Sequence, residues 1–425
     1  MLGADISNKE SVVGPDALNI RLLDGIGPFF KHARSGRVNW SKIPFSQLPR
    51  DGKAFRYCFD EIAVDFRQLC RAAQQWGFNA ITLDDLSHLS DHVWLDSELR
   101  VWVGKLRVEF RKLFEIAEEY DLGVYITADV FTASETIRKK IGDDPAKIHA
   151  FLGELVDRFF ADFPQVQGII FRIGESDGHD VKGALRSELH VRSAKMGRRF
   201  LQDLLPVFEH WGRKLVFRTW TVGAYPVGDL LWHHGTLKRL LRGVNSSALV
   251  LSMKHGSSDF FRYLAVNTNI IVADTMKVAT IVEFQARREY EGAGEFPAFV
   301  GNEHARVRDE VRKLPHVVGY SVWCQTGGWL PFKRLTFLEP EGIWNEVNTA
   351  VTAQLMNFPE MTPEIAVRRW VEVSGLCIDA DTMVELLELS EQVICGMCVS
   401  MRASPCFSGV SASQLCCGFI GILFM

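Results

Sequence analysis

The feature that most constrains the fold is a regular alternation of short apolar runs with longer amphipathic segments. Eight runs have the length and the β-branched or aromatic content of strands. They are residues 55–59, 79–84, 123–127, 167–173, 214–219, 248–253, 280–285 and 317–323. Segments with apolar residues at helical spacing lie between most successive pairs. This alternation predicts parallel strands joined by right-handed helical crossovers.

Two α/β architectures are compatible with such a series. Eight strand–helix units close into a (β/α)₈ barrel, the TIM barrel, whose active site lies at the C-terminal ends of the strands. A doubly wound open sheet usually has five or six strands, and the sequence lacks the glycine fingerprint that binds phosphate in such sheets. We therefore predict an α/β fold built on a (β/α)₈ barrel.

The 425 residues suit a barrel of about 250 residues with additions at both ends. Prolines interrupt residues 1–54, which we expect to form an N-terminal arm or cap before a barrel at 55–340. Beyond it the pattern is helical only, which predicts a C-terminal helical extension over 341–394. Residues 395–425 hold five cysteines but no histidine, and no charge follows Arg402. We expect an irregular tail there rather than a metal site.

The composition is that of an ordinary globular protein. Hydrophobic residues make up 47% and charged residues 24% of the chain, and the formal net charge is -4. This balance gives no general attraction to nucleic acid or to anionic lipid. Residues 1–10 lack a basic region followed by an apolar run, and no stretch reaches the roughly 18 apolar residues that cross a bilayer. We expect a cytoplasmic protein with no nucleic-acid or membrane partner, and the sequence does not indicate its oligomeric state.

Charged and aromatic residues follow the predicted strands at the point where each strand ends. They are Asp84 and Asp85, Asp129, Arg172 and Glu175, Arg218 and Trp220, Lys254 and Asp259, Glu283 and Glu289, and Trp323 with Gln325 and Trp329. In a closed parallel barrel these ends meet at one opening. Carboxyl groups that do chemistry, aromatic faces that stack on sugar rings and cations that hold an anionic substituent together suit a carbohydrate ligand.

Each of these residues also has a structural explanation. Glu175 can be a solvated turn residue, because it lies in the acidic segment Gly174-Glu175-Ser176-Asp177-Gly178. A tryptophan is more often part of a core than a sugar platform, and Lys254 can simply neutralise Asp259. The carbohydrate hypothesis therefore depends on the residues acting as a set.

Three segments add a resemblance to a known family. Residues 253–260 (MKHGSSDF), 282–292 (VEFQARREYEG) and 217–220 (FRTW) resemble the catalytic-barrel motifs of the family 67 glycoside hydrolases, the α-glucuronidases. The second motif is the most specific, and the likeness covers roughly residues 165–330. The family's N-terminal β-domain has no counterpart in residues 1–54.

The resemblance implies roles for particular residues. The family's general acid, in a Ser-Glu-Gly segment after the fourth strand, corresponds to Glu175, although Ser176-Asp177-Gly178 follows it here in place of Gln-Pro-Gly. The water-activating carboxylates correspond to Asp259 and Glu289. The cations that bind the uronate correspond to Lys254 and Arg218. A family lysine before the acid is absent, and Arg172 is the nearest cation.

These observations lead to one main hypothesis, an inverting glycoside hydrolase for oligosaccharides that contain uronic acid. Glu175 would protonate the leaving group, and Asp259 with Glu289 would activate a water held between carboxyl groups roughly 6.5 to 9.5 Å apart. Substrate binding would fall to Arg172, Arg218, Trp220, Lys254, Glu283 and Trp323. The hypothesis requires no cofactor and no metal.

Two other classes of protein stay open. The first is a metal-dependent lyase or isomerase for sugar acids. It would use Asp84, Asp129 and Glu175 as oxygen ligands for Mg²⁺ and Lys254 as the base. The second is a non-catalytic sugar-binding barrel. Loss of activity on adding a chelator would favour the first, and binding of a uronic acid without turnover would favour the second.

Overall fold

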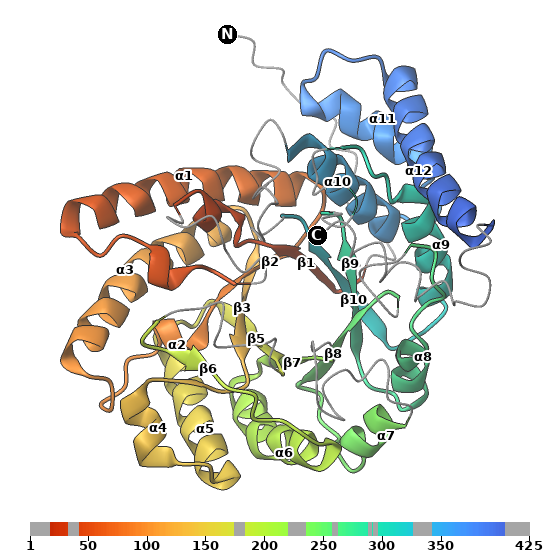
Figure 1. Cartoon of the computed structure of the whole chain (residues 1–425). Coiled ribbons are helices and arrows are strands. Elements are labelled where there is room, and N and C mark those ends of the chain that lie inside the picture. Colours follow the sequence, from red (N-terminus) through yellow and green to blue (C-terminus); the bar gives the residue numbers. More distant parts are fainter. Residues whose placement is uncertain are drawn as a thin grey trace.

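The computed structural model describes residues 18–32, 42–173, 183–219, 235–256, 262–287, 291, 296–325 and 342–403, with side chains through residue 396. Its centre is a closed barrel of eight parallel strands in the order β1-β10-β9-β8-β7-β5-β3-β2 (Figure 1). The barrel strands are β1 (Ile20–Asp24), β2 (Ala80–Asp84), β3 (Gly123–Asp129), β5 (Val166–Arg172), β7 (Lys214–Arg218), β8 (Leu249–Lys254), β9 (Thr280–Gln285) and β10 (Val317–Trp323). The predicted (β/α)₈ fold is confirmed.

Helices surround the strands (Figure 1). They are α1 (Gly52–Gln75), α3 (Ser97–Glu119), α5 (Pro145–Asp162), α6 (Ala194–Trp211), α7 (Thr236–Leu241), α8 (Thr268–Thr275), α9 (Gly301–Val311) and α10 (Ile343–Asn357). The smaller elements are the 3₁₀ turns η1 (Gly27–His32) and η2 (Phe45–Gln47), the helices α2 (Leu86–Leu89) and α4 (Glu135–Ile141), and the antiparallel strands β4 (Thr132–Ala133) and β6 (Arg186–Ser187). None of the helices in the described ranges is long and apolar enough to cross a membrane.

Seven of the eight predicted strands are confirmed, and the one at 55–59 is wrong. Those five residues belong to α1, whose N-terminus is capped by the Asp51 side chain accepting a hydrogen bond from the amide of Ala54. Phe55, Cys58 and Phe59 are buried at helical spacing, and the same face continues to Ile62. Five residues are too few to separate a period of two from a period of 3.6.

The first strand of the barrel is instead β1, inside the segment that we expected to form an arm. β1 pairs with β10 on one side, where Leu22 is in register with Ser321, and with β2 on the other, where Leu22 is in register with Ala80. These two pairings close the barrel. Residues 20–24 therefore belong to the barrel and not to an N-terminal cap.

The barrel interior changes from apolar to polar within two residues along each strand. An inner apolar cluster is formed by Leu22, Ala80, Tyr125, Ile170, Val216, Val250 and Ile281. Alternate strand residues point to the same side, so the next inward residue lies two positions further on. In the same strand order these are Asp24, Thr82, Thr127, Arg172, Arg218, Ser252 and Glu283. The period of two thus puts a polar layer at the C-terminal end of the barrel.

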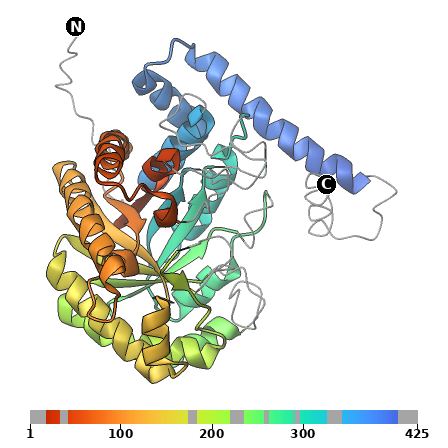
Figure 2. The same cartoon turned by 60° about the vertical axis from the view of Figure 1, so that its left-hand side comes forward.

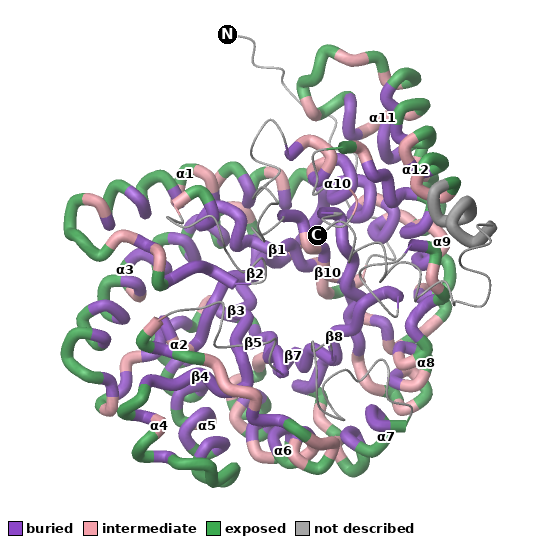
Figure 3. The backbone as a smooth tube through the Cα atoms, viewed as in Figure 1, coloured by how far each residue is buried: buried purple, intermediate pink, exposed green. Residues whose placement is uncertain are grey.

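A second and larger apolar core fills the space between the strands and the helices. It is rich in phenylalanine; for example, the Phe29 and Phe110 rings stack with centroids 5.6 Å apart. The strands β2, β3, β8 and β9 are buried along their whole length, and the other four are mostly buried, as expected for parallel strands with side chains packed on both faces (Figure 3). The site is thereby built on strands that are packed on both faces.

The helices predicted over 341–394 are present, but the first of them completes the ring around the barrel. The α10 helix packs between α9 and β10, and its last residue, Asn357, donates a 3.1 Å hydrogen bond to the carbonyl of Trp76 after α1. Two further helices, α11 (Pro363–Ser374) and α12 (Ala380–Ala403), extend outward from it (Figure 2). The α12 helix continues nine residues into the region expected to be irregular, and residues 404–425 lie outside the described residues.

A buried ionic cluster fixes α12 to the barrel. Arg262, after β8, forms ion pairs with Glu303 of α9, with Glu291 at 3.1 Å and with Glu391 of α12 at 3.3 Å. Glu391 also accepts a 2.6 Å hydrogen bond from the Tyr263 hydroxyl. The neighbouring carboxylates raise the pKa of Arg262 above its usual value, against the effect of burial. The cluster therefore joins four segments through charges that are shielded from water.

We predict that Glu391→Ala lowers the free energy of unfolding by about 3–5 kcal/mol, because it leaves a buried cation without one of its partners. The measurement is urea denaturation followed by circular dichroism. Glu388→Ala is the matched control, because Glu388 is exposed on the same helix and should change stability by less than about 0.5 kcal/mol. Equal stability of the two variants would show that the cluster does not hold α12 in place.

Candidate active site

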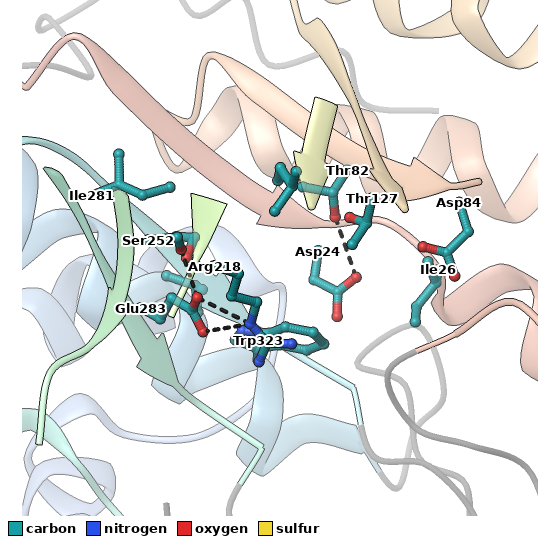
Figure 4. A pocket seen from close by; sticks show the side chains of 13 residues that line it. Asp24, Ile26, Thr82, Asp84, Thr127, Arg218, Ser252, Ile281, Glu283 and Trp323 are labelled. Atoms are coloured by element: carbon teal, nitrogen blue, oxygen red, sulfur yellow. Dashed lines mark hydrogen bonds and ion pairs between the residues drawn. The ribbon is translucent and has the colours of Figure 1, made fainter. Parts of the chain in front are cut away.

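A cavity lies at the C-terminal ends of the strands and receives residues from all eight of them (Figure 4). Its lining residues are Asp24, Ile26, Thr82, Asp84, Thr127, Ile170, Arg218, Ser252, Ile281, Glu283, Ser321, Val322 and Trp323. Its floor is the apolar layer of the barrel, and its walls carry hydroxyl, carboxyl and guanidinium groups. This is the end of a (β/α)₈ barrel at which active sites occur.

One side of the opening is organised around Asp129, the last residue of β3. Its carboxylate accepts hydrogen bonds from Lys42 Nζ at 2.6 Å, Arg172 Nε at 3.0 Å and the Ser187 hydroxyl. The short β4–β6 pairing brings Ser187 to this position. Burial alone would raise the pKa of Asp129, but Arg172 and Lys42 outweigh it and hold the pKa well below its ordinary value. Asp129 is therefore a fixed negative charge.

Asp84, at the end of β2, has weaker partners than Asp129. Its Oδ2 accepts a 2.7 Å hydrogen bond from the amide of Ile43, and its Oδ1 lies 3.7 Å from Arg172 Nη2. Burial raises the pKa of Asp84 to about 6; Arg172 opposes the rise and Asp85 adds to it. This carboxyl group gains and loses its proton close to neutral pH.

On the opposite side, Arg218 of β7 binds Glu283 of β9. Arg218 Nε lies 3.1 Å from both carboxylate oxygens, and the Ser252 hydroxyl donates a 2.6 Å hydrogen bond to Glu283 Oε1. The guanidinium carbons of Arg218 and Arg287 lie 4.6 and 5.1 Å from the ring centroid of Trp323. Trp323 is thus engaged with two cations, which differs from the free sugar platform that we expected.

Asp24, at the end of β1, lies between these two sides (Figure 4). Its Oδ2 accepts a hydrogen bond from the Gln325 side-chain amide, and its Oδ1 is 3.4 Å from the Thr82 hydroxyl. Burial raises the pKa of Asp24 to about 7; Arg287 opposes this rise, and Asp84 reinforces it. Carboxyl groups with raised pKa values in a cleft are typical of functional sites.

Among the residues that the structure describes at this opening, cations outnumber carboxyl groups. Among the described residues that point inward or contact the inward layer, the carboxyl groups are Asp24, Asp84, Asp129 and Glu283. The cations are Lys42, Arg172, Arg218, Lys254 and Arg287. Two of the four carboxyl groups are protonated in part near neutral pH. These described residues therefore favour an anionic ligand.

The structure brings together five of the nine residues to which the main hypothesis gives a catalytic or binding role. Arg172, Arg218, Glu283 and Trp323 form the contacts given above, and Lys254 is buried at the end of β8 in register with Glu283. Glu175, Asp259, Glu289 and Trp220 lie outside the described residues. Their predicted roles stay predictions.

Sequence reasoning missed Asp24, Lys42 and Arg287. Asp24 could have been predicted from the sequence, because the short, mostly apolar run Ile20-Arg21-Leu22-Leu23 is followed by Asp-Gly. The strand ends that were recognised have a similar pattern. Lys42 had none, since it reaches Asp129 from 87 residues away.

The proposed Mg²⁺ ligands of the alternative lyase have a different arrangement. Asp84 and Asp129 both contact Arg172, and Asp129 also binds Lys42. A cation between the two carboxylates already supplies the positive charge that a metal would bring. Within the described residues, no three histidine, cysteine or acidic side chains form a group that could hold a metal ion.

The fold and the site define a (β/α)₈ barrel with charged residues at its opening. Comparison with solved structures supports the same fold. No protein-family model and no curated protein matches the sequence. A solved family 138 glycoside hydrolase, described as targeting pectin rhamnogalacturonan II, matches with a TM-score of 0.58 at 12% identity. The match covers 88% of this chain and 43% of that one.

Two lower-scoring matches are also glycoside hydrolases. A family 89 enzyme from Clostridium perfringens gives a TM-score of 0.47 at 8% identity, over 84% of this chain and 38% of that one. A family 5 enzyme from Prevotella bryantii gives a TM-score of 0.42 at 12% identity, and this match covers 79% of this chain and 96% of that one. This chain thus spans less than half the length of the family 138 and family 89 proteins.

We predict that Asp24→Asn stabilises the protein at pH 8 and has little effect at pH 4. The native state keeps the Asp24 proton up to a pKa of about 7, whereas the unfolded chain releases it at the ordinary carboxyl pKa. Stability therefore falls as pH rises between these two values, and the uncharged amide avoids the loss. The gain at pH 8 should reach up to about 4 kcal/mol.

The measurement is urea denaturation of both proteins from pH 4 to pH 9. Asp309→Asn, an exposed position on α9, is the control and should give a flat difference across this range. A difference for Asp24→Asn that does not grow with pH would show that Asp24 is ionised in the native state throughout.

Proposed function

We propose that this protein is a glycoside hydrolase that acts on oligosaccharides containing uronic acid. The observation that carries the proposal is the opening of the barrel, where, among the described residues, protonatable carboxyl groups lie close to buried cations that outnumber them. An acid with a proton to give near neutral pH is what cleavage of a glycosidic bond requires. Buried cations supply the binding energy for a sugar carboxylate.

The described residues have distinct tasks in this proposal. Glu283 and Ser252 hold the Arg218 side chain in one orientation, because Arg218 Nε is bound by both carboxylate oxygens and Ser252 fixes the same carboxylate. Lys254 is buried next to Glu283 in the sheet register and supplies a point charge beside this guanidinium. Together they would bind the sugar carboxylate, as the α-glucuronidase-like motifs imply.

Arg172 has a different task from the one that we expected. Its guanidinium bridges Asp129 and Asp84, so it sets the charge of the two carboxyl groups instead of reaching for the substrate alone. Asp84 is left with a pKa near neutrality, while Asp129 stays ionised. Two neighbouring carboxyl groups with separated pKa values are a pattern of acid–base sites.

The chemical step is proposed to follow the inverting mechanism. Glu175 donates a proton to the glycosidic oxygen, and Asp259 with Glu289 removes a proton from the attacking water. In the sequence the three residues follow β5, β8 and β9 within five positions, and the ends of these strands border the cavity. The family 138 enzyme of similar fold is described as acting on a pectin component, which is consistent with an anionic carbohydrate substrate.

We expect turnover of 4-nitrophenyl α-D-glucuronide or α-D-galacturonide to exceed turnover of the matched neutral glycosides. The kcat/KM ratio should be about 10²-fold, because a buried charge-assisted contact is worth about 3 kcal/mol. The assay is release of 4-nitrophenol by the purified chain. Equal rates on charged and neutral sugars would remove the uronate assignment, and binding without any turnover would make the protein a sugar-binding barrel.

A second prediction concerns the general acid. Glu175→Gln should lose most turnover on a uronide with a poor leaving group and much less on the 4-nitrophenyl uronide, whose leaving group departs without protonation. Asp259→Asn should slow both substrates alike, since both need an activated water. The experiment compares kcat/KM for both substrates with both variants. The same loss on both substrates for Glu175→Gln, with binding intact, would assign the acid role elsewhere.

A further inference from the structure

The Asp24 side chain differs from the other carboxyl groups of the opening in its partners. Asp129 has two cations, Glu283 has Arg218, and Asp84 has Arg172 at a longer distance. Within the described residues Asp24 forms no ion pair; its side chain accepts hydrogen bonds from neutral groups, which are the Gln325 amide, the Thr82 hydroxyl and the Ile26 backbone amide. It is nonetheless 7% exposed and lines the cavity.

A buried carboxyl group whose hydrogen-bond partners are all neutral is most stable in its uncharged form, unless nearby cations outweigh the effect of burial. In that form it has an O–H group to donate, whereas an ionised carboxylate can only accept. The Gln325 amide donates to Oδ2, so Oδ1, which faces the Thr82 hydroxyl at 3.4 Å, is the oxygen that can carry the proton. Asp24 is therefore placed to donate a hydrogen bond to an acceptor in the cavity.

We propose that Asp24 recognises the carboxylate of the bound uronic acid by donating a hydrogen bond as a neutral carboxyl group, so that one proton binds together with the sugar. This inference rests on the proposed function and names a specificity-determining residue for it. An ionised Asp24 would repel the same sugar carboxylate across a cavity of low dielectric. The proton converts that repulsion into a short, charge-assisted hydrogen bond.

The charged groups around Asp24 agree with this assignment. Arg287 and Arg218 favour its ionised form, while Asp84 opposes it. The Cys324 thiol lies next to it, donating to the Asp24 backbone carbonyl at 3.2 Å, and burial raises the pKa of this thiol. Glu283 lines the same cavity and is bound by Arg218. The pKa of Asp24, about 7, makes its proton available near neutrality, and a bound anion raises that pKa further.

The test is isothermal titration calorimetry of the full chain with D-glucuronate and with D-galacturonate, from pH 6 to pH 9, in buffers that differ in ionisation enthalpy. We expect proton uptake close to one per sugar at pH 8 and much less at pH 6, where Asp24 already holds its proton. The affinity should fall by about tenfold per pH unit above pH 7. Methyl α-D-glucoside, which has no carboxylate, should show no uptake.

Two variants separate the donor role from other roles. Asp24→Asn keeps a donor and cannot ionise, so its uronate affinity should be nearly independent of pH from pH 8 to pH 9, where Asp84 is already ionised, and should exceed that of the wild type at pH 9. Asp24→Ala should bind uronate at least tenfold more weakly than Asp24→Asn at every pH. Asp309→Asn, exposed on α9, should keep the wild-type pH dependence.

Three results would overturn the proposal. The first is uronate binding without proton uptake at pH 8. The second is an Asp24→Asn variant as weak as Asp24→Ala, which would show that Asp24 acts as an ionised acceptor for a sugar hydroxyl. The third is no binding of either uronate at millimolar concentration. A chain that binds uronate with proton uptake but cleaves no glycoside would keep this inference and refute the hydrolase.

Discussion

The structure depends on the closure of eight short parallel strands into one barrel. Closure makes every second residue of each strand point to the same narrow interior. Seven apolar side chains fill one layer, and the residues two positions further on are polar on all seven of these strands. Because the strands are buried on both faces, these polar groups cannot reach bulk water from the sides. They must therefore form hydrogen bonds or ion pairs with one another, or with a ligand at the open end.

The way these groups satisfy one another creates the chemistry of the site. Where a carboxylate finds two cations, as Asp129 does, it becomes a permanent charge. Asp84 has one cation at a longer distance, and Asp24 forms no ion pair within the described residues. These two carboxyl groups keep their protons up to about neutral pH. Burying these groups lowers the stability of the folded state, and the packing of the rest of the fold offsets this loss. Functional sites commonly lower stability in this way.

The periphery of the molecule contributes to the same end of the barrel. Arg262 lies just after the segment that follows β8, and Glu291 lies within the segment that follows β9. The two are joined by a 3.1 Å ion pair, which α9 and α12 reinforce through Glu303 and Glu391. Ion pairs of this kind restrict conformation more than they add stability. The outermost helix is therefore linked to the rim of the proposed site by charge and not only by packing.

The sequence alone determined the repeating unit and the class of residues at the strand ends. Short apolar runs rich in β-branched and aromatic residues, alternating with helical segments and followed by Asp, Arg, Lys or Glu, were enough to predict the barrel, seven of its strands and five of the nine residues given a catalytic or binding role. These signals are local, since each can be recognised within about ten residues. The strand at 55–59 was wrong for the same reason, because a five-residue window is compatible with both a helix and a strand.

Only the tertiary structure decided which strand closes the barrel, which helix completes the ring and which charges are paired. Leu22 reaches Ser321 and Ala80, and Asn357 reaches the carbonyl of Trp76, across most of the chain. The partners of Asp24 and Asp129 lie 301 and 87 residues away. The protonation state of a carboxyl group depends on its burial and on the charges within a few ångströms. No local pattern carries that information, so the sequence located the acids while the fold determined which of them hold a proton.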